Sequence, residues 1–198
     1  MTTITPEAIK ELRDKTSAGI MDCKQALADS DGDVDKAVDF LRKKGIATAS
    51  KKSSRATNEG IISSYIHMGG KIGVLVEINC ETDFVARLDE FQNFVKDVSM
   101  QVAAAAPIYV SSDEVAEDFI EKEKEVIKAQ LEEKPPEILD KIVQGKIDKR
   151  FKEICLLDQG FIKDDSQTIG QLLTALIAKT GENIVIRRFV RFELGSDS

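Results

Sequence analysis

The sequence has few of the residues on which catalytic and metal sites depend. Its 198 residues include one histidine, His67, and three scattered cysteines, Cys23, Cys80 and Cys155. The cysteines lack the spacing of zinc ligands, and an odd, scattered set predicts free thiols in a reducing cytosol rather than a disulfide framework. No glycine-rich phosphate loop is present. We therefore expect no catalytic residues, no metal site and no cofactor.

The sequence also lacks an excess of positive charge and any long apolar run. Its formal net charge is -7. Because phosphate binding draws on clustered Lys and Arg, we expect no direct contact with nucleic acid. No signal peptide, lipidation signal or membrane-spanning run is found, which predicts a soluble cytoplasmic protein that does not bind membranes.

Residues 1–54 predict a small module of three helices followed by a linker. Thr5-Pro6-Glu7 is typical of a helix start, because it supplies a cap, a proline suited to the first helical position and an acid. A third helix is predicted after Asp33, and Gly45 is predicted to end it. Its apolar face has helical spacing and consists of Val34, Ala37, Val38 and Leu41.

Six basic residues lie near the end of this module, with no acid until Glu59. They are Arg42, Lys43, Lys44, Lys51, Lys52 and Arg55. We interpret the segment as a solvated hinge or an exposed helix extension, and a phosphate-binding patch is the alternative.

Residues 55–198 predict an antiparallel sheet packed by helices, so the fold class is α+β. Strict alternation predicts a strand from Ile72 to Cys80, paired with a strand before His67 across a glycine turn. The segment NIVIRRFVRFELG predicts a last strand. A helix from Phe84 to Ala104 is predicted from a stripe of apolar residues at alternating steps of four and three. The stripe consists of Phe84, Leu88, Phe91, Val95, Val98 and Val102.

The acidic stretch from Asp113 to Asp140, with the helical segment that follows it, predicts a helical hairpin at about residues 113–158 that projects from the sheet. Pro135-Pro136 breaks it into two helices. The hairpin is either a solvated face that needs no partner or an arm that docks on another chain. In the second interpretation Ile142, Ile147 and Phe151 are partly exposed.

Two residues with reactive side chains admit alternative interpretations. Cys80 and His67 lie in paired strands, so they are the one candidate for a Cys-His nucleophile pair. Cys80 also lies on the apolar side of its strand, where a thiol is usually a small buried hydrophobe.

Three stretches resemble the elongation factor Ts family, and together they extend along nearly the whole chain. LRDKTSAGIMDCKQAL is similar to the N-terminal block of the family, with Ser17 in place of glycine and Ile20 in place of methionine. IHMGGKIGVLVEINCETDFVAR matches the family hallmark almost residue for residue. GENIVIRRFVRFELG resembles the closing strand, whereas Gly160 stands where the family has proline.

The resemblance implies a guanine-nucleotide exchange factor for elongation factor Tu, and not an enzyme. Such a factor binds its partner in the GDP-bound and nucleotide-free states. Thr82, Asp83, Phe84 and Val85 would insert beside the partner's switch helices and dislodge Mg²⁺, so that GDP leaves and GTP can bind.

The resemblance also assigns roles to other parts of the chain. The N-terminal module would be ubiquitin-associated-like (UBA-like) and would contact the partner's nucleotide domain. His67 would add a further contact. The chain resembles a short form with one copy of the core, so two chains would pair as a homodimer in a 2:2 complex. The expected contacts in the module are Leu12, Arg13, Ile20 and Met21.

Alternatives to this assignment remain on the residues alone. Phe84 continues the apolar stripe, so its spacing also fits a core position. A helical adaptor that binds ubiquitin-like partners through the N-terminal module is a second possible function, and an enzyme that depends on Cys80 is a third.

Overall fold

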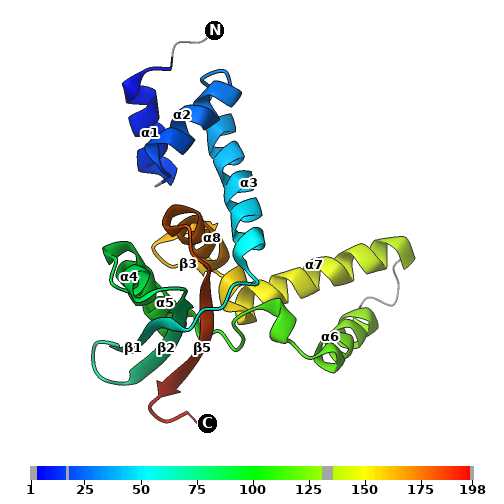
Figure 1. Cartoon of the computed structure of the whole chain (residues 1–198). Coiled ribbons are helices and arrows are strands. Elements are labelled where there is room, and N and C mark those ends of the chain that lie inside the picture. Colours follow the sequence, from blue (N-terminus) through cyan, green and yellow to red (C-terminus); the bar gives the residue numbers. More distant parts are fainter. Residues whose placement is uncertain (1–3, 17, 131–135, 197–198) are drawn as a thin grey trace. The chain divides into compact units, whose positions relative to one another are not determined.

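The computed structural model describes residues 4–16, 18–130 and 136–196, and it is a mixture of helices and sheet (Figure 1). The α+β class is therefore confirmed. Ser17 and Pro135 lie outside the described residues. The helices are α1 (Pro6–Thr16), α2 (Ile20–Asp29), α3 (Val34–Lys52), α4 (Asp83–Ala86), α5 (Asp89–Ala105), α6 (Glu117–Ala129), α7 (Pro136–Ile154) and α8 (Ile169–Thr180). The strands are β1 (Glu59–Ile66), β2 (Ile72–Cys80), β3 (Gly160–Phe161), β4 (Asp164–Thr168) and β5 (Ile184–Glu193).

Strands β1, β2 and β5 form a three-stranded sheet with β2 in the centre. The predicted hairpin of β1 and β2 is confirmed, and the His67 N–H donates to the Ile72 carbonyl at 2.9 Å across its turn. Two contacts show that strand β5 is antiparallel to β2. The Leu194 N–H donates to the Lys71 carbonyl, and the Arg188 side chain forms an ion pair with Glu77. The contact that lies earlier along β5 thus lies later along β2. Strands β3 and β4 form a separate antiparallel pair.

The alternation of β2 gives the sheet one covered face and one open face. Val74, Val76 and Ile78 are buried, whereas Leu75 between them is exposed. The Arg191 guanidinium of β5 donates to the Ala103 carbonyl of α5 at 3.3 Å, so the C-terminal part of α5 contacts the covered face. Period-two patterning of this kind is typical of an antiparallel sheet with one solvated side.

Packing divides the chain into two compact units, and each unit combines segments that are distant in sequence. The first contains residues 1–61, 78–95 and 171–186, and the second contains residues 62–77, 96–170 and 187–198. The predicted division into a module of residues 1–54 and a core of residues 55–198 concerns which segment folds by itself, and it stays a prediction.

Helices α1, α2 and α3 form a three-helix bundle in the first unit. The Asp33 carboxylate caps α3 by accepting from the Lys36 N–H at 3.1 Å. Partly buried apolar side chains, among them Val34, Val38 and Leu41, pack around its centre. The fully buried residues of this core are Leu12, Cys23, Ala26, Leu27 and Ala37.

The prediction that Gly45 ends the third helix is wrong. Helix α3 continues to Lys52, and Gly45 is one of its buried residues. A Cβ at this position would lie 3.6 Å from the Thr174 side chain and 3.8 Å from the Ala178 Cβ, both in α8. The absence of a side chain therefore serves the close approach of two helices, and no left-handed cap is formed here.

The predicted continuous helix from Phe84 to Ala104 is also wrong. Helix α4 ends at Ala86, α5 begins at Asp89, and a tight turn centred on Arg87 separates them. Arg87 and Leu88 donate their N–H groups to the carbonyls of Phe84 and Val85, three residues earlier. The turn shifts the phase of the apolar stripe, so its later members Phe91, Val95, Val98 and Val102 are buried while Phe84 and Leu88 are exposed.

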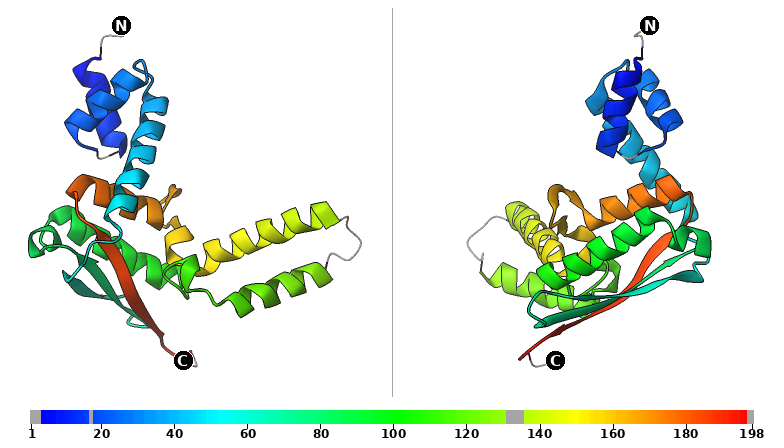
Figure 2. Two further views of the ribbon diagram at one scale, coloured as in Figure 1. Left: turned by 45° about the vertical axis from the view of Figure 1, so that its right-hand side comes forward. Right: turned by 90° about the vertical axis from the view of Figure 1, so that its left-hand side faces the viewer.

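Helices α6 and α7 lie side by side in the second unit (Figure 2). Ile127 of α6 packs with Val143 and Ile147 of α7, and all three side chains are buried. Ile147 therefore belongs to the packing of this helix pair, which contradicts its expected partial exposure on a docking arm. Within the described ranges, no helix is both long and apolar enough to span a bilayer.

We expect Gly45→Ala to raise the free energy of unfolding by about 0.5–1 kcal/mol, because alanine is the better helix former. Its methyl group would meet Thr174 and Ala178 at ordinary contact distances. Urea denaturation measures the change. Gly45→Leu is the matched control and should destabilise the protein, because the longer side chain overpacks this contact. A loss of stability in both variants would contradict our account of α3 and α8.

Candidate partner-binding site

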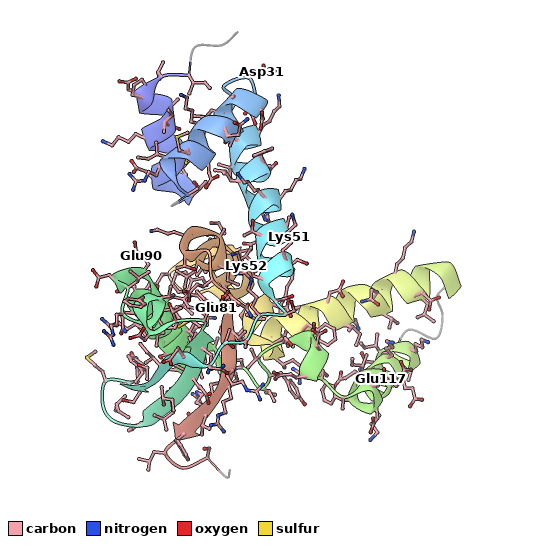
Figure 3. The ribbon with its side chains drawn as sticks, in the orientation of Figure 1. Asp31, Lys51, Lys52, Glu81, Glu90 and Glu117 are labelled. Atoms are coloured by element: carbon pink, nitrogen blue, oxygen red, sulfur yellow. The ribbon has the colours of Figure 1, made fainter. Side chains whose placement is uncertain are left out.

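The segment between β2 and α5 contains the four residues expected to act on a partner. The chain leaves the sheet at Cys80 and enters α4 at Asp83, and Thr82 is the N-cap. The Thr82 hydroxyl accepts from the Val85 N–H at 3.4 Å, as side chains at N-caps do. The preceding residue, Glu81, is labelled in Figure 3.

Phe84 is displayed to solvent by the first turn of α4. Its side chain is 76% exposed, whereas the next two residues, Val85 and Ala86, are each 6% exposed and anchor the turn. Leu88, after the turn, is 42% exposed. The core position that spacing allowed for Phe84 is thus contradicted. Aromatic side chains are enriched at protein–protein interfaces relative to the rest of the surface, and the contact itself stays a prediction.

Asp83 is also accessible, and its present partner is a neighbour on the same short helix. Its carboxylate forms a 2.7 Å ion pair with the Arg87 guanidinium, and both side chains are substantially exposed. Exposed pairs of this kind contribute about 1 kcal/mol or less. Asp83 can therefore exchange Arg87 for a group on another protein at little cost.

Thr82 differs from Asp83 and Phe84, because its polar groups are bonded within the chain. Its N–H and its hydroxyl donate to the two carboxylate oxygens of Glu182, at 3.0 and 2.6 Å. Its carbonyl accepts from the Cys80 thiol at 3.1 Å and from the Ala86 N–H at 3.3 Å. Thr82 and Val85 thus support the site, and Asp83 and Phe84 form its accessible part.

A second set of bonds lies beside the first. The Asn183 N–H donates to the Glu81 carboxylate at 2.6 Å, and the same carboxylate lies 3.4 Å from the Arg55 guanidinium. The buried Asn183 side chain donates to the carbonyls of Ser53 and Arg55 at 3.3 and 2.9 Å. Our reading of the sequence missed Glu182 and Asn183. The available signal was a pair of polar residues between Gly181 and a strand, and it does not identify their partners.

The residues expected to bind in the N-terminal module differ in accessibility. Leu12 is 0% exposed and lies in the core of the three-helix bundle, so its side chain cannot contact a partner. This corrects its assignment. Arg13 is exposed on α1, and Ile20 and Met21 are exposed on the first turn of α2.

His67 follows β1 in the second unit and is exposed. Its Nδ1 lies 3.0 Å from the Tyr65 hydroxyl, so the two side chains share a hydrogen bond. The structure contradicts a Cys80–His67 nucleophile pair, because His67 pairs with Ile72 at one end of β2 and Cys80 lies at the other end. Burial, with the charge of Glu182, raises the pKa of the Cys80 thiol to about 11, so this thiol is protonated at neutral pH.

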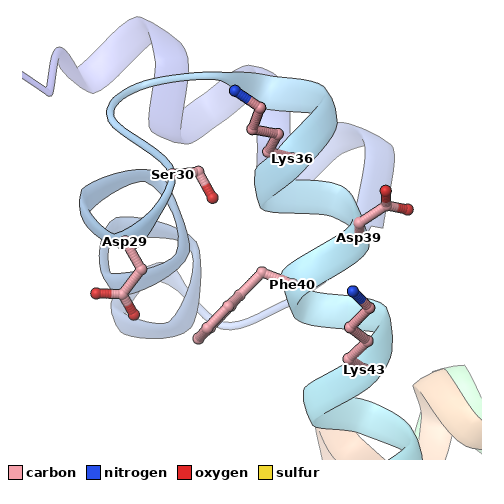
Figure 4. A pocket seen from close by; sticks show the side chains of 6 residues that line it. All are labelled: Asp29, Ser30, Lys36, Asp39, Phe40 and Lys43. Atoms are coloured by element: carbon pink, nitrogen blue, oxygen red, sulfur yellow. The ribbon is translucent and has the colours of Figure 1, made fainter.

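A hollow of about 280 Å³ lies on the bundle between α2 and α3 (Figure 4). The Phe40 ring extends toward α2, and charged side chains of both signs surround it. None of the residues expected to bind a partner lines this hollow. Its lining residues are Asp29, Ser30, Lys36, Asp39, Phe40 and Lys43. Across the described ranges, no three or more His, Cys, Asp or Glu side chains are grouped to hold a metal ion.

Comparison with known proteins gives one consistent result. The model of the family described as Elongation factor TS matches residues 7–196. The chain is 57% identical to an Elongation factor Ts of Thermoanaerobacter sp. (strain X514), over 97% of this chain and 95% of the relative. It is 56% identical to that of Syntrophus aciditrophicus (strain SB), over 98% of each chain. It is 58% identical to that of Anaeromyxobacter sp. (strain Fw109-5), over 98% of this chain and 90% of the relative.

We expect the cysteines of the folded protein to resist alkylation. Burial raises the pKa of Cys80 and of Cys155 to about 11 and also raises that of Cys23. Iodoacetamide at pH 8, followed by mass spectrometry, should label them far more slowly in buffer than in urea. Below pH 9 the native thiols of Cys80 and Cys155 stay protonated, and their protection should fall only as the pH approaches 11. Met68→Cys, at an exposed turn position, is the accessible control, and labelling of Cys80 at the rate of that control would contradict the burial of this strand end.

Proposed function

Because the chain belongs to the elongation factor Ts family, whose members promote nucleotide exchange on elongation factor Tu, we propose that Asp83 and Phe84 accelerate GDP release from that partner. The observation that supports this role is the exposure of Phe84 between supports that are themselves buried or bonded. An aromatic side chain held in this way suits insertion into a pocket of another protein.

The proposed mechanism changes a release rate without making or breaking a covalent bond. Phe84 wedges between helices next to the partner's nucleotide site, and Asp83 exchanges Arg87 for groups that otherwise support the Mg²⁺ ion. Mg²⁺ neutralises phosphate charge, so its displacement weakens the hold on GDP. Linkage is reciprocal: a factor that weakens nucleotide binding is itself weakened by the nucleotide, and incoming GTP therefore releases it.

We assign the other parts of the chain supporting roles in the same complex. The three-helix bundle acts as a UBA-like module that contacts the nucleotide domain through Arg13, Ile20 and Met21, while Leu12 stabilises its core. His67 provides a further contact, and the pair of α6 and α7 projects as a hairpin. The protein acts in the cytoplasm and contacts neither nucleic acid nor membrane.

We further propose that two copies pair through the open face of the sheet, which gives a 2:2 complex with elongation factor Tu. Ile66 and Gly73 share this face, because a Cβ on Gly73 would lie 3.2 Å from the Ile66 side chain. Glu77 lies on the open face of β2 and forms a 2.7 Å ion pair with Arg188 of β5. Arg188 and the alternate residues that follow it in β5 therefore lie on the open face as well. An apolar patch of this kind is covered when the same face of a second copy meets it. Its exposed apolar members are Ile62, Ile66, Leu75, Val190, Phe192 and Leu194.

Replacement of Phe84 by alanine separates binding from stability. The side chain is 76% exposed, so Phe84→Ala should change the free energy of unfolding by no more than about 0.5 kcal/mol. A core role would cost about 3–5 kcal/mol. We expect the release of fluorescent GDP from elongation factor Tu to slow by about tenfold or more. Asp83→Ala should slow it too, and Ile108→Ala, which removes another exposed apolar side chain, is the control. An unchanged release rate in Phe84→Ala would overturn the proposal.

Replacement of Phe192 by glutamate tests the pairing of two copies. A charge in the centre of an apolar interface is costly to bury, so light scattering should give the parent as a dimer and Phe192→Glu as a monomer near 21.9 kDa. Met68→Glu alters an exposed apolar residue of the hairpin turn and should leave the dimer intact. A monomeric parent chain, or a dimeric Phe192→Glu, would contradict pairing through this face.

A further inference from the structure

We infer that Glu182 is a positioning residue for nucleotide exchange, which holds the start of α4 so that Phe84 is displayed in one orientation. The inference rests on the proposed role of Phe84, and it adds a residue 100 positions away from Thr82 in the sequence. Glu182 acts through Thr82 and has no role in contacting the partner.

The contacts of Glu182 reach the residue that follows Phe84. One carboxylate oxygen accepts from the Thr82 N–H at 3.0 Å, and the other accepts from the Thr82 hydroxyl at 2.6 Å. That hydroxyl accepts in turn from the Val85 N–H at 3.4 Å. Hydrogen bonds to an ionised carboxylate are stronger than those between neutral groups. The carboxylate therefore fixes the backbone immediately before and, through Thr82, immediately after Asp83 and Phe84.

The short helix needs support of this kind. Helix α4 spans four residues, Asp83–Ala86. Helices this short are unstable without external contacts, because the entropy lost in ordering the first turn exceeds the stabilisation from its hydrogen bond. The exposed ring of Phe84 contributes little packing of its own. The orientation of Phe84 therefore depends on the supports of this turn, namely the Glu182 carboxylate on one side and the buried side chains of Val85 and Ala86 on the other.

Glu182 is itself held on both sides. Gly181, at φ +75°, ends α8 in the left-handed region that favours glycine, and its carbonyl accepts from the Lys52 ammonium. On the other side, Asn183 is bonded to Glu81, Ser53 and Arg55. The carboxylate is thus presented from a turn that hydrogen bonds hold on both sides, which is what a positioning residue requires.

Because Glu182 orders Phe84 before the partner binds, we expect it to affect the rate of GDP release more than the affinity of the factor for its partner. A wedge that is mobile before binding must be ordered during binding, and that cost reduces the free energy available to displace the nucleotide. The side-chain hydrogen bonds of Glu182 go to Thr82, so we expect the other proposed contact surfaces to be unaltered when Glu182 is changed. Loss of the carboxylate should therefore lower the rate of GDP release in the saturated complex more than it changes the concentration of factor needed for saturation.

The first test uses the protein without its partner. The chain has no tryptophan, so Phe84→Trp introduces a single fluorophore at the tip of the site. In this background, Glu182→Ala should increase the amplitude of nanosecond motion in time-resolved fluorescence anisotropy. Glu90→Ala is the matched control. It also removes a carboxylate, one that forms a 3.0 Å ion pair with Lys179 in the last turn of α8, the helix that precedes Glu182. Equal anisotropy decays for the parent and Glu182→Ala would overturn the inference, whatever the exchange assay shows.

The second test measures GDP release from elongation factor Tu as a function of factor concentration. Glu182→Ala should lower the maximal rate by about tenfold and change the half-saturating concentration by less than about twofold. Glu182→Gln should recover part of the rate, because its amide oxygen can still accept one of the two bonds. In the Phe84→Ala background, Glu182→Ala should have no further effect, since it acts through Phe84.

Two outcomes of the second test would overturn the inference. One is an additive loss in the double variant, and the other is a loss of half-saturating affinity equal to the loss of rate. If Glu182→Ala does not fold, Glu182→Gln takes its place in both assays and decides whether the inference holds. If Phe84→Ala itself exchanges at the parent rate, the proposed function is wrong, and the anisotropy measurement still decides whether Glu182 holds the helix start.

Discussion

The hydrogen bonds between residues 81–82 and residues 182–183 are the constraint on which the candidate site depends. They follow from the sheet topology, because β5 is antiparallel to β2 and the first residues of β5 therefore lie beside the last residues of β2. Each segment supplies a carboxylate that accepts from the backbone of the other, Glu81 from Asn183 and Glu182 from Thr82. Strand pairing brings the two turns together, and these reciprocal bonds fix their conformation.

The four residues at the start of α4 divide into two that support and two that are displayed. Thr82 and Val85 are bonded or buried, and their contacts, with the buried Ala86, stabilise the turn. Asp83 and Phe84 have the opposite character, since one forms only an exposed ion pair and the other has an apolar ring in water. A motif that is contiguous in sequence thus combines a rigid base with an accessible tip, because side chains of neighbouring helical residues point in different directions.

The sequence predicts the sheet well because its signal is local. Alternation in β2 identifies Val74, Val76 and Ile78 as buried, and the structure agrees. The helix signals fail where tertiary contacts decide. Gly45 looks like a terminator, yet it is buried within a longer helix, and Phe84 fits the stripe of α5 only if the turn at Arg87 is overlooked. Residue identity alone cannot distinguish a glycine that ends a helix from one that lets two helices approach.

The supporting residues of the site are the least predictable part, and the reason is physical. Glu182 follows Gly181 in a loop, where a carboxylate is ordinarily solvated, and no periodicity relates it to a residue 100 positions earlier. Its partner can be inferred only after the strand order is known. The distance in sequence between Glu182 and the residues that it supports is compatible with an exchange factor. The displayed residues have to contact another protein, whereas the residues that hold them can come from any segment that the sheet brings near. Rigidity at the tip then lets the binding energy of the whole surface act on the nucleotide site, because little of it is consumed in ordering the wedge.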